Sequence, residues 1–438
     1  MFHSTKGRAA VGSALAAVLL TAGCGGSDAS SETAYDPNAP VTIDVGLFGT
    51  FGYKEAGLYD EYMSLHPNVT IKETSVEQSA DYYKALQTRL AAGSGLADVQ
   101  GIEIGFVADI VANHADQFED FSKTENADAV KDTFYDWKYQ EATTADGKVL
   151  GLGTDAGPQA MCFRKDLFQQ AGLPTDRAQL GQLWSTWDGY LDVARQYEAS
   201  PTKQADSAFL DSPGSIFSSA VYQGDLAFDD KDGNPAPDTS DGVKSAWGYA
   251  SKAAAEGLTA GLSQFGDEWN SAFANGGFAT ISCPAWMLGY IDSQAGPENA
   301  GTWDVAPLPG GASNWGGSWL GVPTAAEDKQ AAMALVEWLT APEQQVKMFT
   351  EEQHFPSSSV AAEDPAVAGA TSEYFSGAPI GQLFGDSAAK IKRTPIGPYD
   401  TQMTQAFTTA LTNVAAKGQS PDAAWDDALA NVEQVTGG

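Results

Sequence analysis

VTIDVGLFGTFGYKEAGLYDEYMSLHPNVTIKETSV, residues 41–76, decides the fold class of this chain. Its first eight residues alternate and then turn apolar, which predicts a buried strand over 41–48. Leu58, Tyr59 and Tyr62 share one face of a predicted helix, which ends at the following His-Pro-Asn. The β-branched run 69–76 predicts a second strand. The stretch therefore reads as strand, helix, strand.

The same alternation continues downstream. Tyr82, Leu86 and Leu90 stand four residues apart and predict a helix that ends at the Gly-Ser-Gly of 93–95. Residues 98–105 predict a third strand. This order indicates an α/β lobe with a largely parallel sheet.

The length of the chain predicts a second lobe. Its 438 residues exceed what one core normally serves. Glycines and prolines interrupt the apolar segments of 149–174. Residues 303–311 likewise end in prolines and glycines. Both places suit a chain that crosses between lobes.

The first 23 residues predict an export signal. Lys6 and Arg8 precede the apolar run 9–20, and small residues follow before Cys24. The run is too short for a membrane-spanning helix, which needs about 20 apolar residues. LTAGC, residues 20–24, resembles the lipobox of bacterial lipoproteins, which implies a diacylglyceryl group on Cys24. An ordinary secretion signal is the alternative, and 24–40 has the composition of a flexible tether.

The charge of the chain excludes some partners. Twenty-four Lys and Arg face 57 Asp and Glu, for a net charge of −33. Nucleic-acid binding depends on cationic side chains that neutralise phosphates, so this balance argues against it. It also disfavours a polyanionic ligand.

Three segments carry a family resemblance: CFRKDLFQQAGLP (162–174), AFANGGFATISCPAW (272–286) and AMALVEWLTAPEQQ (332–345). Their ordered set resembles the extracellular solute-binding proteins, family 1, of carbohydrate ABC transporters, the family of maltodextrin-binding protein, over residues 41–438. The chain departs from the family's usual Pro-Asp at Ala97-Asp98 and from its usual Gly-Lys at Gly276-Gly277.

The resemblance implies a type II periplasmic-binding-protein-like α/β fold with two lobes and a ligand cleft between them. The lobes would be 41–154 plus 307–352 and 155–306 plus 353–438, and they would close on a sugar by a hinge motion. It also implies a monomer on the outer face of the cell membrane, an ABC permease as partner, and no cofactor.

Catalytic motifs are scarce. Beyond the signal the chain holds only His66, His114 and His354, and it lacks HExxH. GGSWLG (316–321) lacks the second glycine of a nucleophile elbow. DDKDG (229–233) resembles a calcium loop, but Phe228 and Thr239 stand at loop positions one and twelve, where carboxylates are required, so it reads as a polar hairpin. A glycosidase with Glu103 and Asp155 as its carboxylate pair stays open as an alternative.

Cys162 and Cys283 each lie in a strand-like run, and the resemblance places both strands in one lobe. In an exported protein this predicts a disulfide, which would contribute about 4–5 kcal/mol by the chain-entropy argument. Two buried free thiols are the alternative.

Sugar recognition needs aromatic faces for the C–H surfaces of a pyranose and planar polar groups for its hydroxyls. Candidates follow from strand ends and crossings, and Trp286 also matches a sugar-stacking tryptophan of the family, with core packing as its alternative. The candidates are Phe51, Tyr53, Glu103, Asp155, Gln159, Trp286, Trp315 and Trp319.

The sequence thus predicts a lipid-anchored subunit of an ABC importer that binds a neutral oligosaccharide. A β-linked fragment of a plant polymer is preferred, because flat glycans stack along successive aromatics. A surface glycan-degrading enzyme is one alternative, and a binder of a polyamine or peptide is another.

Overall fold

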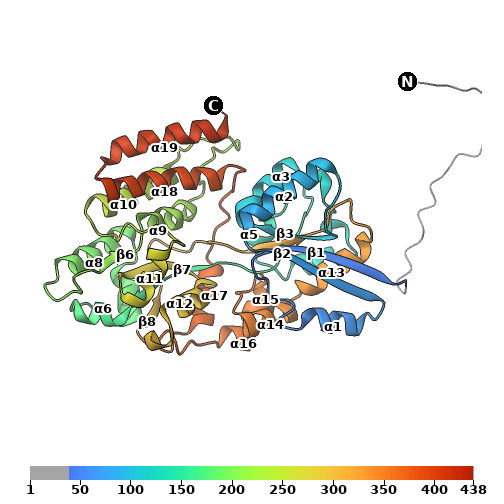
Figure 1. The fold of residues 1–438 in the computed structure, drawn as a ribbon, viewed down its shortest axis with the longest axis horizontal. Helices are drawn as coiled ribbons and strands as arrows, with labels where there is room; N and C mark the ends of the chain where they lie inside the picture. Colours follow the sequence, from blue (N-terminus) through green and yellow to red (C-terminus); the bar gives the residue numbers. More distant parts are fainter. Residues whose placement is uncertain (1–38, 438) are drawn as a thin grey trace, which may run out of the picture. The chain divides into compact units, whose positions relative to one another are not determined.

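In the computed structural model, which describes residues 39–437, the chain folds around two sheets (Figure 1). The first sheet contains β1 (Val41–Phe48), β2 (Val69–Val76), β3 (Val99–Glu103), β4 (Leu152–Gly153) and β9 (Ser318–Gly321). Their order is β2-β1-β3-β9-β4. β1 pairs in parallel with β2 and β3, whereas β9 runs antiparallel to β3 and β4. The expected largely parallel sheet therefore receives one late antiparallel strand.

Helices cover both faces of this sheet. They include α1 (Leu58–Leu65), α2 (Ser79–Ala92), α3 (Ile104–Asn113) and α13 (Lys329–Leu339). Leu58 of α1 and Leu335 of α13 share one buried cluster with Leu320 of β9. Tyr82 of α2 shares a different cluster with Trp319, the neighbour of Leu320 on the same strand. Because successive strand residues point to opposite faces, the sheet separates two apolar layers.

The second sheet contains β5 (Gln159–Arg164), β6 (Ala208–Leu210), β7 (Phe278–Pro284) and β8 (Trp303–Ala306). Its order is β6-β7-β5-β8, with β5 antiparallel to both of its neighbours. Every residue of β5, β7 and β8 is buried. The chain thus has two α/β lobes, one around each sheet.

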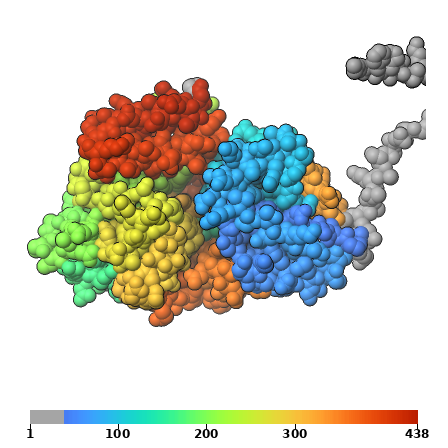
Figure 2. Space-filling model, in the orientation of Figure 1, coloured from blue at the N-terminus to red at the C-terminus, as the bar shows by residue number. Residues whose placement is uncertain are grey.

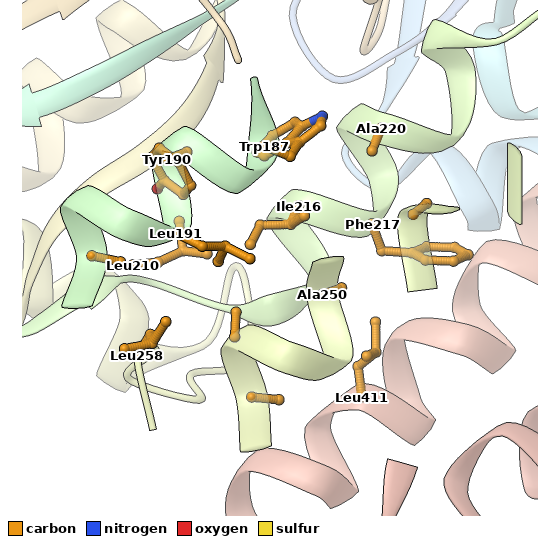
Figure 3. Packing of buried hydrophobic residues seen from close by; sticks show 14 of the residues in the cluster. Trp187, Tyr190, Leu191, Leu210, Ile216, Phe217, Ala220, Ala250, Leu258 and Leu411 are labelled. Carbon is orange, nitrogen blue, oxygen red and sulfur yellow. The ribbon is translucent and has the colours of Figure 1, made fainter. Parts of the chain in front are cut away.

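The second lobe has the larger aromatic core (Figure 3). Its helices include α8 (Trp187–Ala199), α9 (Pro213–Ala220), α10 (Asp241–Ala255), α18 (Asp400–Lys417) and α19 (Pro421–Thr436). Tyr190 of α8, Phe217 of α9 and Leu411 of α18 are buried together. The C-terminal helices α18 and α19 lie against each other and against α10, as the red and yellow-green atoms of Figure 2 show.

The remaining α-helices are short. They are α4 (Ala127–Lys131), α5 (Asp136–Glu141), α6 (Lys165–Gln170), α7 (Arg177–Leu183), α11 (Asp267–Asn275), α12 (Met287–Ala295), α14 (Pro342–Glu352), α15 (Ser359–Glu363), α16 (Pro365–Ala368) and α17 (Ile380–Ala388).

The first three predicted strands are confirmed, two of them with the predicted bounds. The third ends at Glu103, two residues early, because α3 begins at Ile104 and Glu103 caps it. The predicted polar hairpin is also present: Asp229 pairs with Pro235, and the Asp230 carboxylate accepts the Asp232 N–H.

A disulfide joins Cys162 of β5 to Cys283 of β7. The two cysteines occupy diagonal positions on adjacent strands, since Cys162 pairs with Ile281 and Cys283 pairs with Ala160. The bond closes a sequence separation of 121 residues within the second lobe.

The predicted signal, the Cys24 lipidation site and nearly all of the tether lie outside the described residues. Over residues 39–437, none of the helices combines the length and the apolar character that a bilayer crossing requires.

Candidate functional site

Three chain segments run between the two sheets, and we call them the crossing segments: residues 154–158, 312–318 and 353–358. They are hydrogen-bonded to one another. The Trp315 N–H donates to the Gly157 carbonyl at 2.8 Å, and the Ala156 N–H donates to the Phe355 carbonyl at 2.8 Å. Asp155 adds a side-chain link, since its Oδ1 accepts the Ser318 N–H at 2.9 Å. The lobes are therefore connected by a narrow, ordered hinge.

Glycines permit the close packing of these segments. A Cβ on Gly157 would collide with the Trp315 carbonyl. Gly316 has φ 108°, and a Cβ there would lie 2.7 Å from Nε1 of Trp286. Both positions need glycine, the second for its backbone as well as for space.

A cleft of about 860 Å³ opens beside the crossing segments. Six of the eight predicted site residues line it: Phe51, Tyr53, Glu103, Asp155, Trp286 and Trp315. They come from both lobes and from two crossing segments. The other lining residues are Phe48, Gly49, Thr50, Glu77, Thr154, Gly289, Tyr290, Gly316, Gly317, Ser318, Met348, Glu351, Glu352, Gln353 and His354.

The first-lobe wall of the cleft is Phe48, Phe51 and Tyr53. The rings of Phe48 and Phe51 meet edge to face at 5.1 Å, and those of Phe51 and Tyr53 lie 5.9 Å apart. Phe51 is only 9% exposed and Tyr53 only 2%. These rings pack mainly on one another and on the core.

The second-lobe wall is Trp286 and Tyr290 together with Trp315 of a crossing segment, whose ring packs against the second-lobe core, and all three are half-buried. The Trp286 and Trp315 rings lie 5.5 Å apart at 75°. The Trp286 indole N–H donates to the Trp315 backbone carbonyl at 2.9 Å, which orients the Trp286 ring. Trp286 is not at a strand end as expected: β7 stops at Pro284, and Trp286 is the N-cap residue of α12.

Two predicted carboxylates face the cleft. Glu103 caps α3, and its Oε2 accepts the Gly105 N–H at 2.8 Å. Burial raises the pKa of Glu103 to about 7, although the Gly105 N–H and the Lys138 ammonium oppose the shift. At neutral pH this carboxyl can donate as well as accept a hydrogen bond.

A buried lysine behind the cleft was missed by sequence reasoning. Lys138 is fully buried, and its Nζ lies 3.1 Å from the ring centroid of Trp319 and 4.0 Å from Oε2 of Glu141. Burial lowers the pKa of Lys138 to about 8 and raises that of Glu141 to about 7. In the described part of the chain neither Nζ nor that Oε2 has a hydrogen-bond partner. Nothing in DWKYQE (136–141) marks this lysine as buried.

Two predicted residues lie elsewhere. Trp319 is completely buried, and its indole N–H donates to the Lys138 carbonyl at 3.3 Å. Its strand neighbour Ser318 lines the cleft, so alternation along β9 turns Trp319 to the opposite side. Gln159 is 1% exposed, and it lines a separate cavity of about 180 Å³, which Lys390 also lines. The expected cleft positions of these two residues are wrong.

The cleft also receives the C-terminal end of α14, which sequence reasoning missed. Glu351, Glu352, Gln353 and His354 line it there. Gln353 has φ 61°, a left-handed conformation that ends the helix. The only sequence signal was a helical pattern that stops before Pro356.

A smaller cavity of about 270 Å³ adjoins the cleft. It shares Glu103, Trp315 and Gly316 with the cleft, and Thr401 and Gln405 of α18 complete it on the other side. Across residues 39–437, no three His, Cys, Asp or Glu side chains are grouped to hold a metal ion.

Comparisons with known proteins agree with this architecture. The profile described as bacterial extracellular solute-binding protein matches residues 57–373. The crystal structure of an extracellular solute-binding protein family 1 is 39% identical, covers 91% of this chain and 100% of its own, and superposes with a TM-score of 0.84.

Two further relatives carry ligand names. The lactose-binding protein of Rhizobium radiobacter is 24% identical over 85% of each chain. The ABC transporter associated binding protein of B. animalis subsp. lactis, solved with beta-1,6-galactobiose, is 22% identical, with 90% and 98% of the chains covered and a TM-score of 0.70.

Proposed function

Because this chain belongs to the family of bacterial extracellular solute-binding proteins, we propose that it captures a neutral oligosaccharide in the cleft and hands it to the permease of an ABC importer. The family consists of binding proteins and not of enzymes. Closure of the two lobes about the crossing segments would trap the ligand.

The observation that carries this proposal is the second-lobe wall. Trp286 and Trp315 are half-buried and stand at 75° to each other, and the Trp286 indole is hydrogen-bonded to the Trp315 backbone carbonyl. Such fixed faces suit the C–H surfaces of sugar rings. Asp155 and Glu103 add hydrogen-bonding groups to the lining of the same cleft.

The charges of the cleft favour a neutral ligand over an anionic one. Among the described residues that line it, none is a lysine or an arginine. A phosphorylated or acidic sugar would meet carboxylates without a cationic partner, which is unfavourable. The lactose-binding and galactobiose-bound relatives support a β-linked glycan, in line with the preference for plant-polymer fragments.

One observation favours a second candidate, a polyamine. Five carboxylates line the same cleft: Glu77, Glu103, Asp155, Glu351 and Glu352. Amines pair with carboxylates, and aromatic faces attract cations. A short peptide is a third candidate ligand, and the test below includes it.

We assign the lobes as 41–154 plus 307–352 and 155–306 plus 353–438. The assignment is supported by the membership of the two sheets, since β1 to β4 and β9 fall in the first set and β5 to β8 in the second. A lipid anchor on Cys24 and a monomeric state complete the proposal.

The test is a thermal-shift screen of the mature protein, followed by calorimetry. The panel contains β-linked and α-linked neutral oligosaccharides, spermidine and short peptides. A ligand at 100 times its Kd stabilises the folded state by about 2.7 kcal/mol, which raises Tm. Stabilisation by neutral sugars is expected, and it should be reduced in W286A. Stabilisation by spermidine or peptides with none by any sugar would overturn the proposal.

A further inference from the structure

Phe265 has an unusual backbone. It lies in the loop before α11 with φ 63°, the left-handed region that a Cβ disfavours. In the described part of the chain only Phe265, Gln353 and Ser376 adopt this region without being glycine. Glycine or asparagine would be the usual choice for such a site.

Packing does not explain the phenylalanine. Half of the residue is exposed, 51% by area, whereas its neighbour Trp269 is completely buried. A half-exposed ring gains less from burial than a core ring does. The backbone therefore disfavours phenylalanine at this position, and burial favours it only in part.

The surroundings of the other two left-handed residues, Ser376 and Gln353, account for their conformation. The Ser376 hydroxyl donates to the carbonyls of Gly301 and Trp303, so its conformation serves the fold. Gln353 lines the cleft. Strained backbone persists where the surroundings enforce it, and it is frequent at binding sites.

Phe265 stands beside the second-lobe wall. Its ring centroid lies 5.8 Å from that of Tyr290 and 6.4 Å from that of Trp315, both at steep angles. It also contacts Trp269 at 5.0 Å, which supports it from behind. Phe265 thus contacts Trp315 and Tyr290, two residues that line the cleft, and Trp315 in turn contacts Trp286 at 5.5 Å.

We propose that Phe265 is a specificity-determining residue that covers a sugar unit at the rim of the cleft, beyond the units at Trp286 and Trp315. This inference rests on the proposed function. It names the substrate class more narrowly: oligosaccharides long enough to reach the rim are preferred over mono- and disaccharides. The strained backbone holds the ring where a long ligand passes.

The experiment measures the Kd of galacto-, xylo- and malto-oligosaccharides of one to five units by calorimetry. F265G removes the ring and relieves the left-handed backbone, and F265Y keeps the ring. We expect F265G to lose roughly tenfold in affinity for the longest ligands and nothing for the shortest. F265Y should bind like the wild type. The Tm of unliganded F265G should not fall.

L183A is the matched control, because Leu183 is 46% exposed at the end of α7 and lines neither the cleft nor its rim. It should bind all lengths like the wild type. Equal affinity of F265G and wild type for every length, or an equal loss at every length, would overturn the inference and leave the proposed function standing. A wild type that binds no member of the series and no other sugar of the thermal-shift panel overturns both the inference and the proposed function.

Discussion

The two walls of the cleft hold a similar number of aromatic rings but use them differently. Phe51 and Tyr53 on the first-lobe wall are 9% and 2% exposed, and their rings contact one another. Trp286 and Trp315 on the second-lobe wall are half-buried and tied to the hinge by a hydrogen bond. An aromatic-rich cleft therefore need not offer all its rings to a ligand. Phe51 and Tyr53 of the first wall belong to the core, whereas Phe48 and the three rings of the second wall are partly exposed.

Removal of the disulfide should have the largest effect on stability, and the loss should be confined to the second lobe. In the double variant C162A/C283A we expect the free energy of unfolding to fall by about 4 kcal/mol, because a long loop is no longer closed in the unfolded chain. Denaturant unfolding with and without reductant measures the loss. Hydrogen exchange should show β5 and β7 losing protection while β1 and β2 keep theirs. Equal losses in both sheets would contradict a lobe-specific role for the bond.

Tyr53→Ala tests whether the first wall is core. Removal of a buried ring leaves a cavity, so we expect a loss of about 3 kcal/mol in unfolding free energy. The Kd of the stabilising sugar, measured well below Tm, should change much less than in W286A. Y53F is the control and should differ little from the wild type. If Y53A weakened binding strongly while its stability stayed intact, the comparison between the walls would have to be reversed.

Trp286→Ala tests whether the second wall binds ligand. Loss of a stacking tryptophan should cost about 2 kcal/mol of binding free energy, or about 30-fold in Kd, as calorimetry would show. W286F keeps a smaller face and should lose less. The stability of W286A should change less than that of Y53A, because Trp286 is only half-buried. An unchanged Kd would remove the stacking role.

The pH dependence belongs to the first lobe. Burial raises the pKa of Glu103 and of Glu141 to about 7, so between pH 4.5 and 7 the folded state binds more protons than the unfolded state. The free energy of unfolding should therefore fall as pH rises through that window, by at most about 3 kcal/mol for each group, because one pKa unit corresponds to about 1.4 kcal/mol.

The same logic reverses at alkaline pH for Lys138. Its folded pKa is lowered to about 8, so above pH 8 the unfolded state binds more protons and stability from this group rises. Denaturant titrations from pH 5 to 9.5 should show a shallow minimum between pH 7 and 8. E141Q should reduce the acidic slope. A slope of the same size in E141Q would mean that other carboxyls cause it.

Much of the fold could be predicted because it is local. The alternation of apolar residues and the residues that end helices predict the first and last residues of β1 and β2 correctly. The antiparallel entry of β9 depends on contacts more than 200 residues apart, which no local pattern carries.

The site could be predicted only in part. Residues at strand ends and crossings, such as Phe51, Asp155 and Trp315, do line the cleft. Trp315 and Trp319 are both predicted to line the cleft, but β9 begins between them, at Ser318, and its alternation turns Trp319 into the core. Lys138 and the end of α14 were missed because their place at the cleft is set entirely by tertiary packing.

The hydrogen bond from the Trp286 indole to the Trp315 carbonyl has an optical consequence. One partner lies at the start of α12 and the other in a crossing segment, so rotation of the lobes about the hinge alters the polarity around both indoles. Indole emission depends on that polarity. If the lobes close as proposed, the emission of this pair would report closure without an added label, once the signal of the other nine tryptophans is separated by comparison with W286F and W315F.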